Sequence, residues 1–514
     1  MNGAESLLRT AAAAGLEVCF ANPGTTEMPL VVALDAAPQL RAVLGLFEGV
    51  CTGAADGYGR MAGRPALTLL HCGPGFANGI ANLHNARRAR TPVVNLIGDH
   101  ATWHAAADAP LASDIESLAR PVSGWLRRAS SGSRLASDGA HAIRAACTPP
   151  GQVASLIVPH DIQWCDAAQA AEPLAPPEAP RCDGTAIAAA VTALRAEGRA
   201  ALLLGGAALA DVGLRAAGRI ARATRCTLIH DTFVARLERG SGLPRVERLP
   251  YFPEQARELL GGFQRLILVG ARDPVAFFGY RDQPSRLAPP TLAVLELASA
   301  ESDGVAALEA LAEDLGAREA WADEDPGKRP DRPSGALSVG SLGQALAALQ
   351  GEGAIVVDEA ATSGIAYHAH ARHAPRHTVL GLTGGAIGQG LPCAVGAAIA
   401  CPQRKVIALQ ADGGAMYTLQ SLWTAAREGL DIVAVICANR AYRILQVELA
   451  RAGVSAPGPK AAALTALDSP ALDWVALARG MGLPGVRTET ADAFAAALER
   501  ALAEPGPVLI EAVL

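Results

Sequence analysis

Polar residues at the ends of two neighbouring apolar runs form the most informative feature of the sequence. Asp412 follows the run 406–410, and Asn439 follows the run 432–438. Each run predicts a strand, and a right-handed crossover between parallel strands places both ends at one edge of a sheet. A carboxylate and an amide oxygen suit Mg²⁺, which prefers oxygen ligands and usually binds together with phosphate groups. The backbone carbonyl of Ala441 could supply a third ligand.

Gly413 and Gly414 follow Asp412 directly and precede a helix that we expect over roughly 416–428, with Gly429 as its C-terminal cap. Glycines at the start of a helix let backbone N–H groups approach phosphate oxygens. The simpler alternative is a strand–turn–helix in which Asp412 is only an N-cap. Asn439 at the end of the next strand favours the metal site over this alternative.

Two segments upstream could complete a site for a phosphorylated ligand. Thr362 follows a buried run at 354–358 and could hydrogen-bond a phosphate. The stretch 383–392 holds four glycines, so its backbone is available to a flat ligand, and Ile387 is an isolated bulky residue within it.

Three features of the first 100 residues also carry candidate chemistry. Glu48 ends an apolar run and precedes a helix of small residues at 54–60. His71 ends a predicted strand and precedes a glycine-rich turn, which is followed by Asn78. A histidine at the end of a strand is often structural, so a role for His71 in proton transfer depends on what surrounds it. The stretch 22–27, which contains Thr25, predicts a turn at the end of a strand.

Continuous apolar runs alternate with amphipathic stretches along the whole chain, which indicates strands buried on both faces of parallel sheets. The length of 514 residues suggests about three domains. Two proline-rich linkers, 167–180 and 323–334, divide the sequence. We therefore predict an α/β protein with three doubly wound parallel-sheet domains, over 1–166, 182–322 and 335–514. The predicted strands are 66–71, 93–98, 200–205, 266–270, 354–358, 406–410 and 432–438.

Composition excludes several classes of protein. The net charge of −6 and the absence of dense basic clusters, apart from 87–90, argue against a nucleic-acid binder. No apolar stretch is long enough to span a membrane, and residues 1–5 do not resemble a signal peptide, so we expect a cytoplasmic protein. The 10 cysteines form no CxxC pair, which predicts free thiols rather than disulfides or structural zinc.

Together these motifs resemble the superfamily of thiamine-diphosphate-dependent decarboxylases and acetolactate synthases over essentially the full length. The order of parts is most similar to benzoylformate decarboxylases and acetolactate-synthase-like large subunits. The family's Gly-Asp-Gly and Asn-Asn motifs stand here as Ala411-Asp412-Gly413 and Ala438-Asn439, and each departs by one alanine. The resemblance implies thiamine diphosphate with Mg²⁺, the ion being held by Asp412, Asn439 and the carbonyl of Ala441.

The resemblance also implies roles for other residues. The Gly385 carbonyl would accept from the aminopyrimidine, Ile387 would lie under the thiazolium, and Glu48, supplied by a partner subunit, would protonate the pyrimidine ring. A homodimer with shared active sites follows, and often a tetramer. Thr25 would contact the substrate carboxylate, His71 would relay protons, and Asn78 would orient the loop or the substrate. Further residues implied around the cofactor are Ala361, Thr362, Gly413, Gly414, Tyr442 and Ile444.

The expected activity is decarboxylation of a 2-oxo acid, carboligation, or both, on a small-molecule substrate. Bound FAD is possible in the middle domain but is not favoured, because the domain lacks a GxGxxG motif. Residues 273–281 lack the histidine that benzoylformate decarboxylase has in this region, which puts benzoylformate as the substrate in doubt. The main alternative is a catalytically silent or regulatory homologue that binds the cofactor, motivated by Ala411 and Ala438. A pyridine-nucleotide dehydrogenase is disfavoured for want of a fingerprint motif.

Overall fold

The computed structural model describes residues 1–167, 169–319, 321 and 327–514. These residues form two compact units. The first combines 1–176 with 329–514, and the second is made of 177–328. Each unit is built from parallel sheets covered by helices, so the predicted α/β class is confirmed. Within the described residues no helix is both long and apolar enough to cross a membrane.

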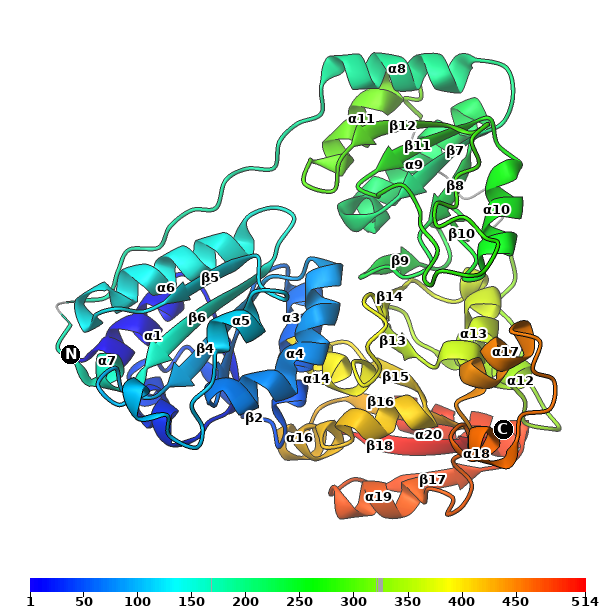
Figure 1. The fold of residues 1–514 in the computed structure, drawn as a ribbon. Helices are drawn as coiled ribbons and strands as arrows, with labels where there is room; N and C mark the ends of the chain where they lie inside the picture. The colour runs from blue at the N-terminus through cyan, green and yellow to red at the C-terminus, as the bar shows by residue number, and fades with distance from the viewer. Residues whose placement is uncertain (168, 320, 322–326) are drawn as a thin grey trace. The chain divides into compact units, whose positions relative to one another are not determined.

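The N-terminal segment is built on a six-stranded sheet with the order β2-β1-β3-β4-β6-β5 (Figure 1). All its neighbouring strands are parallel. Because their side chains are buried on both faces, these strands read as continuous apolar runs. The strands are β1 (Val18–Asn22), β2 (Arg41–Leu44), β3 (Ala66–Leu70), β4 (Val93–Asp99), β5 (Trp125–Arg128) and β6 (Val153–Pro159).

Helices cover both faces of this sheet. One face packs against α1 (Gly3–Ala13), α2 (Met28–Ala33), α6 (Gly132–Cys147) and α7 (His160–Trp164). The other packs against α3 (Glu48–Ala62), α4 (Cys72–Ala89) and α5 (Ile115–Ala119). The basic cluster 87–90 lies at the C-terminal end of α4, as predicted, and Arg90 is its left-handed cap.

The C-terminal segment forms a second parallel sheet, in which strands follow one another in the order β17-β18-β16-β15-β13-β14. One face is covered by α12, α13 and α20, and the other by α14, α16 and α19. The strands are β13 (Ile355–Glu359), β14 (His377–Gly381), β15 (Val406–Ala411), β16 (Ile432–Ala438), β17 (Gly485–Thr488) and β18 (Val508–Val513). The helices are α12 (Val339–Leu349), α13 (Ile365–His370), α14 (Gly390–Ala400), α15 (Asp412–Ala415), α16 (Ser421–Glu428), α17 (Arg443–Arg451), α18 (Pro459–Ala463), α19 (Trp474–Gly480) and α20 (Ala491–Ala503).

One hydrophobic core joins the N-terminal and C-terminal segments into a single unit. It contains Tyr58 and Leu83 from the first and Leu391 and Val406 from the second. The two segments meet where α3 packs on α14 (Figure 1). A Cβ atom on Gly57 would lie 2.0 Å from the Cys393 carbonyl oxygen, so the close approach of the two helices requires glycine there.

The middle unit is a five-stranded parallel sheet with the order β10-β8-β7-β11-β12. Its core is built from the strands and the apolar faces of the helices. The strands are β7 (Ala200–Leu204), β8 (Thr227–His230), β10 (Glu247–Arg248), β11 (Arg265–Val269) and β12 (Ala293–Ala298); β9 covers Leu237–Arg239. The helices are α8 (Gly184–Arg195), α9 (Asp211–Thr224), α10 (Pro253–Gly261) and α11 (Gly304–Asp314).

Local predictions are confirmed with one refinement, which concerns the helix expected over 416–428. Every predicted strand is present within one residue at each end, and Gly429 caps α16 in the left-handed conformation. The single helix expected over 416–428 is instead broken: α15 starts at Asp412, a 3-10 turn follows over 416–418, and α16 begins at Ser421. All ten cysteines are free thiols, as predicted.

Candidate functional site

The structure joins the two strand ends that the sequence placed at one sheet edge. β15 and β16 are parallel neighbours, with Ala411 opposite Cys437. The Asp412 carboxylate accepts hydrogen bonds from the backbone N–H groups of Gly413 (2.8 Å) and Arg440 (2.6 Å), so it bridges both loops. Asp412 is only 2% exposed, and this burial raises the pKa of its carboxyl although the amide hydrogen bonds act in the opposite direction.

The turn after Asp412 has the shape of a cradle. A Cβ on Gly413 would lie 2.4 Å from the Tyr442 ring, and one on Gly414 would lie 2.9 Å from Glu359 Oε1. A side chain at Gly413 or Gly414 would therefore displace Tyr442 or Glu359. The N-cap of α15 is Ala411, so Asp412 is not the capping residue that the simpler interpretation expected.

Asn439 and Ala441, the other two predicted metal ligands, lie in the loop after β16. Asn439 Oδ1 accepts from the Ala441 N–H at 3.1 Å, which holds the loop after β16 in a tight turn. A buried carboxylate, an amide oxygen and a main-chain carbonyl form an all-oxygen set, and such a set fits a divalent cation bound to a diphosphate.

Three loops at the site contain non-glycine residues in the left-handed conformation. These are Cys72 (φ 48°), Ala361 (φ 48°) and Arg440 (φ 54°). Such conformations cost free energy and are retained only where the surrounding structure imposes them. Ala361 and the half-buried Thr362 form the first turn after β13, the position that the sequence assigned to a phosphate contact.

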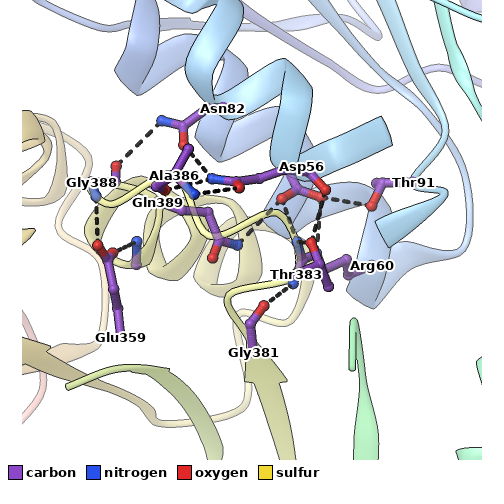
Figure 2. Close-up of polar contacts among 12 residues, drawn as sticks. Asp56, Arg60, Asn82, Thr91, Glu359, Gly381, Thr383, Ala386, Gly388 and Gln389 are labelled. Atoms are coloured by element: carbon purple, nitrogen blue, oxygen red, sulfur yellow. Dashed lines mark hydrogen bonds and ion pairs between the residues drawn. The ribbon is translucent and has the colours of Figure 1, made fainter. Parts of the chain in front are cut away.

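The glycine-rich loop 381–390 is fixed by side chains of α4 that the sequence did not single out (Figure 2). Asn85 holds Ala386 from both sides: its Nδ2 donates to the carbonyl (2.8 Å), and its Oδ1 accepts from the N–H (3.2 Å). Asn82 Nδ2 donates to the Gly388 carbonyl at 3.3 Å. Gly385 (φ 76°) and the half-buried Ile387 are thus presented on a loop whose backbone is bound on both sides of them.

A buried ion pair anchors the start of the same loop (Figure 2). Arg60 Nη2 lies 2.6 Å from Asp56 Oδ2, and both side chains belong to α3. Arg60 also donates to the Gly381 carbonyl (2.7 Å) and to Thr383 Oγ1 (3.2 Å). Thr91 Oγ1 donates to Asp56 Oδ1 at 2.6 Å. The pair therefore ties the N-terminal segment to the glycine-rich loop of the C-terminal segment.

Glu48 is buried at the first position of α3, with 8% of its surface exposed. The Nδ2 of Asn78, which the sequence also singled out, donates to Glu48 Oε2 at 3.0 Å. A Cβ on Gly75 would lie 2.7 Å from Glu48 Oε1, so Gly75 makes room for this carboxylate. Asn82 Nδ2 donates to the Gly49 carbonyl (2.8 Å) as well as to Gly388, so the start of α3 and the loop are joined within one chain.

His71 forms a pair with a buried glutamate that the sequence analysis missed. His71 Nδ1 lies 2.8 Å from Glu27 Oε2, and Glu27 is fully buried. A Cβ on Gly24 would collide with the His71 ring at 2.4 Å, and one on Gly98 with Glu27 Oε1 at 1.6 Å. These two glycines were the available signal in the sequence. A carboxylate on Nδ1 favours the tautomer of the neutral ring that carries its proton on Nδ1, which leaves Nε2 as the acceptor.

The Cys72 thiol next to His71 is not a candidate nucleophile. Burial raises its pKa to about 11, so it stays protonated at neutral pH. Thr26 Oγ1 lies 3.3 Å from the Cys72 sulfur and also bonds Glu27. The thiol therefore belongs to the hydrogen-bonded wall behind the histidine.

A cavity of about 370 Å³ opens beside this pair. Thr25, the predicted contact for a substrate carboxylate, lies on its wall. Three histidines and an indole line the rest, so the wall offers ring faces and imidazole hydrogen-bonding groups. The other lining residues are Thr26, His100, Ala101, Trp103, His104 and His160.

Three further residues lie on or just before α17. Tyr442 faces Gly413 beside the metal-type donors, and burial raises the pKa of its phenol. Ile444 is half-buried on α17, near the start of that helix. Glu448, on the same helix, lies 3.9 Å from Arg451 Nε and so has a cationic neighbour.

Comparison with known protein families agrees with this geometry. Residues 1–118 match the N-terminal TPP binding domain of thiamine pyrophosphate enzymes. Residues 360–512 match the C-terminal TPP binding domain of the same enzymes. The first match contains Glu48 and His71, and the second contains Thr362, Asp412 and Asn439.

Full-length relatives extend the match to the whole chain. A Mycobacterium tuberculosis protein named as an acetolactate synthase large subunit, IlvX, is 49% identical over 100% of this chain and 99% of its own. Benzoylformate decarboxylase of Pseudomonas aeruginosa is 30% identical over 97% of this chain and 96% of its own. The solved thiamine diphosphate-dependent 4-hydroxybenzoylformate decarboxylase of Rhodococcus jostii superposes with a TM-score of 0.84 at 25% identity, covering 99% of this chain and 98% of its own. The chain therefore belongs to the thiamine pyrophosphate enzymes, in the group that includes acetolactate synthases and benzoylformate decarboxylases.

Proposed function

We propose that the protein is a thiamine-diphosphate- and Mg²⁺-dependent enzyme that acts on a 2-oxo acid, by decarboxylation, carboligation or both. The observation that carries the proposal is the buried Asp412 carboxylate, which joins the ends of β15 and β16 beside a two-glycine cradle. A carboxylate kept out of water at such a cost is well suited to a bound cation.

The residues that would hold the cofactor come from four loops of the C-terminal segment. Asp412, Asn439 and the Ala441 carbonyl would bind Mg²⁺, and Gly413, Gly414, Ala361 and Thr362 would surround the diphosphate. Gly385, Ile387, Tyr442 and Ile444 would line the rings. When bound, thiamine diphosphate supplies a carbon nucleophile and an electron sink for the loss of CO2.

Glu48 and His71 would handle protons. Asn78 binds one oxygen of Glu48, so the other oxygen is available to share a proton with a ring nitrogen. Glu27 holds His71 Nδ1, so Nε2 would give a proton to, or take one from, the substrate. We expect Glu48→Gln to keep thiamine diphosphate bound but to slow hydrogen–deuterium exchange at its C2 atom. An exchange rate equal to that of the wild type would contradict this role.

The cavity beside Thr25 would take the substrate. Its imidazole and indole groups suit a 2-oxo acid with a polar or aromatic side chain. The charge of Glu448 alone would favour decarboxylation or an aldehyde acceptor over a second anionic substrate. Arg451 lies close enough to offset part of that charge, so both reactions stay within the proposal.

The decisive experiment measures CO2 release with Mg²⁺ and thiamine diphosphate across 2-oxo acids from pyruvate to benzoylformate. We expect turnover of one or a few of them, and loss of cofactor binding in Asp412→Ala. Unchanged cofactor affinity in that variant would overturn the metal assignment. Bound cofactor without turnover of any 2-oxo acid would instead support a silent or regulatory homologue, the reading that Ala411 and Ala438 motivate.

We also propose a homodimer with shared active sites, or a tetramer built from two such dimers. The proposal is supported by the family resemblance, whereas Asn82 joins the start of α3 to the loop inside one chain. Mixing Glu48→Gln subunits with Asp412→Ala subunits separates the two arrangements. Shared sites would restore about a quarter of wild-type activity, because half of the dimers would be mixed and each would have one intact site. No recovery, with mixed dimers demonstrated by mass, would assign both residues to one chain.

A further inference from the structure

Glu359, the last residue of β13, is buried against the glycine-rich loop. Only 4% of its surface is exposed. Its Oε1 accepts from the Gly388 N–H at 2.5 Å, and its Oε2 accepts from the Gly390 N–H (Figure 2). Each carboxylate oxygen thus holds one amide, and the two amides flank Gln389.

The loop that Glu359 holds is one that needs external support. Gly385 and Gly388 both have positive φ (76° and 94°), which glycine adopts readily. Glycine also loses more conformational entropy on folding than any other residue. Ordering such a segment costs conformational entropy that contacts must offset. Side chains of α4 bind the loop from one side, and Glu359 binds it from the other.

In the part of the chain that the structure describes, the contacts of Glu359 are with backbone amides and an acidic neighbour and include no cation. Within the described residues its hydrogen bonds come from backbone amides, and the ionisable groups near it are Asp358 and the Cys393 thiol. Asp358 is itself occupied by His368 at 2.7 Å. Burial raises the pKa of Glu359 to about 7 even though the amides favour the charged form.

Burying a carboxylate without a cation costs free energy, so its hydrogen bonds must differ from those that a neutral side chain could make. Ionised, it offers two acceptors to two N–H groups. Protonated, or replaced by an amide, it presents a hydrogen to one of them. The geometry of two amides on two oxygens therefore selects the ionised group.

We propose that Glu359 is a positioning residue, whose carboxylate holds the loop 384–390 in the conformation that binds the cofactor by clamping the amides of Gly388 and Gly390. The proposal deepens the function proposed above and rests on it. Glu359 acts through the loop, on the residues that would meet the aminopyrimidine and the thiazolium. It also lies against Gly414, so the clamp connects the loop to the diphosphate cradle.

The test compares Glu359→Gln with a matched control, Glu511→Gln. Glu511 is a second buried glutamate of the same sheet, at 1% exposure in β18, and it does not bond the loop. Hydrogen–deuterium exchange of peptides covering 384–390 is measured without cofactor, and thiamine diphosphate affinity is measured by titration with excess Mg²⁺. We expect at least about tenfold faster loop exchange and about tenfold weaker binding in Glu359→Gln, from the loss of a charge-assisted hydrogen bond, and neither change in Glu511→Gln.

Glu359→Asp serves if the glutamine variant does not fold. It keeps the charge but is too short by one methylene to reach both amides, so it should show the same changes in smaller measure. Wild-type exchange and affinity in both Glu359 variants would overturn the proposal. Asp412→Ala distinguishes this failure from failure of the proposed function, because it weakens cofactor binding through the metal while loop exchange without cofactor stays at the wild-type rate.

Discussion

Two buried carboxylates hold the same loop by different means. Asp56 is paired with Arg60 and bonded by Thr91, and the pair reaches the loop through Gly381 and Thr383. Glu359 reaches it directly and is bonded by backbone amides. The first arrangement carries its own counter-charge and so acts as a permanent joint between segments. The second is poised to gain or lose a proton near neutral pH. A loop can thus be fixed in place at one end and adjustable at the other.

The largest expected effect comes from breaking the paired anchor. Asp56→Ala leaves the Arg60 guanidinium buried without its carboxylate, and we expect it to lower the free energy of unfolding by about 3–5 kcal/mol. Urea denaturation followed by circular dichroism measures this. Asp56→Ala combined with Arg60→Met removes both charges and should recover much of the loss. A single-variant loss below about 1 kcal/mol would show that the pair is not a structural joint.

We expect Glu359 to make the free energy of unfolding depend on pH. Its pKa is raised from 4.5 to about 7, so the folded protein binds this proton more tightly than the unfolded chain. The corresponding stability is fully present below pH 4.5 and is lost as the pH rises through about 7, an effect of about 3 kcal/mol. Glu359→Gln should lack this slope in unfolding free energy measured from pH 4.5 to 8.

Cofactor binding should move the other way in the wild type, because the ionised carboxylate is the clamp. Stability would fall, and thiamine diphosphate affinity would rise, over the same pH range. If unfolding free energy and thiamine diphosphate affinity rise together with pH, Glu359 does not act as a titratable anchor, and the contrast with the Asp56–Arg60 pair is lost.

A smaller effect is expected from the hydroxyl that supports Asp56. Thr91→Val removes a 2.6 Å hydrogen bond to a buried carboxylate, and we expect a loss of about 1.5–2 kcal/mol in unfolding free energy. Thr91→Ser keeps the hydroxyl and should retain more of the stability. Wild-type stability in Thr91→Val together with a loss in Thr91→Ser would assign the effect to the methyl group instead of the hydroxyl.

The smallest change is expected at the residue between the anchors. Gln389 Nε2 donates to Asp56 Oδ2 at a long 3.3 Å, while its buried Oε1 has no hydrogen-bond partner among the described residues. Gln389→Met removes both a weak bond and an unsatisfied acceptor, so unfolding free energy should change by less than about 1 kcal/mol. A larger loss would make Gln389 a third anchor.

Patterns that repeat along the chain were readable from the sequence. Buried parallel strands leave continuous apolar runs, and glycine at 429 marks a helix end, so the sheets and the approach of Asp412 to the loop after Asn439 followed from spacing. The break in the predicted helix 416–428 did not, because the 3-10 turn lies against the loop at Gly388, to which Thr418 Oγ1 donates at 2.8 Å. Tertiary contact decided that conformation, not local propensity.

The anchors themselves escaped prediction for the same reason. Glu27, Glu359, Asn82 and Asn85 are unremarkable in sequence, and their roles arise from partners that lie far along the chain. Neighbouring glycines were the available traces: Gly24 and Gly98 leave space for His71 and Glu27, and Gly414 leaves space for Glu359. One sequence shows which residues can do chemistry, and the fold shows what holds them.

The core shared by α3 and α14 has a consequence for synthesis. α3 ends at Ala62, while α14, which covers its apolar face, begins at Gly390, roughly 330 residues later in the chain. At about 5–20 residues per second, a ribosome makes that stretch in roughly 15–65 seconds. During this interval the middle unit is synthesised, and the face of α3 that packs on α14 has no partner yet from its own chain. In the nascent chain, that face of α3 is therefore either covered by a transient binding partner or exposed to solvent until α14 is synthesised.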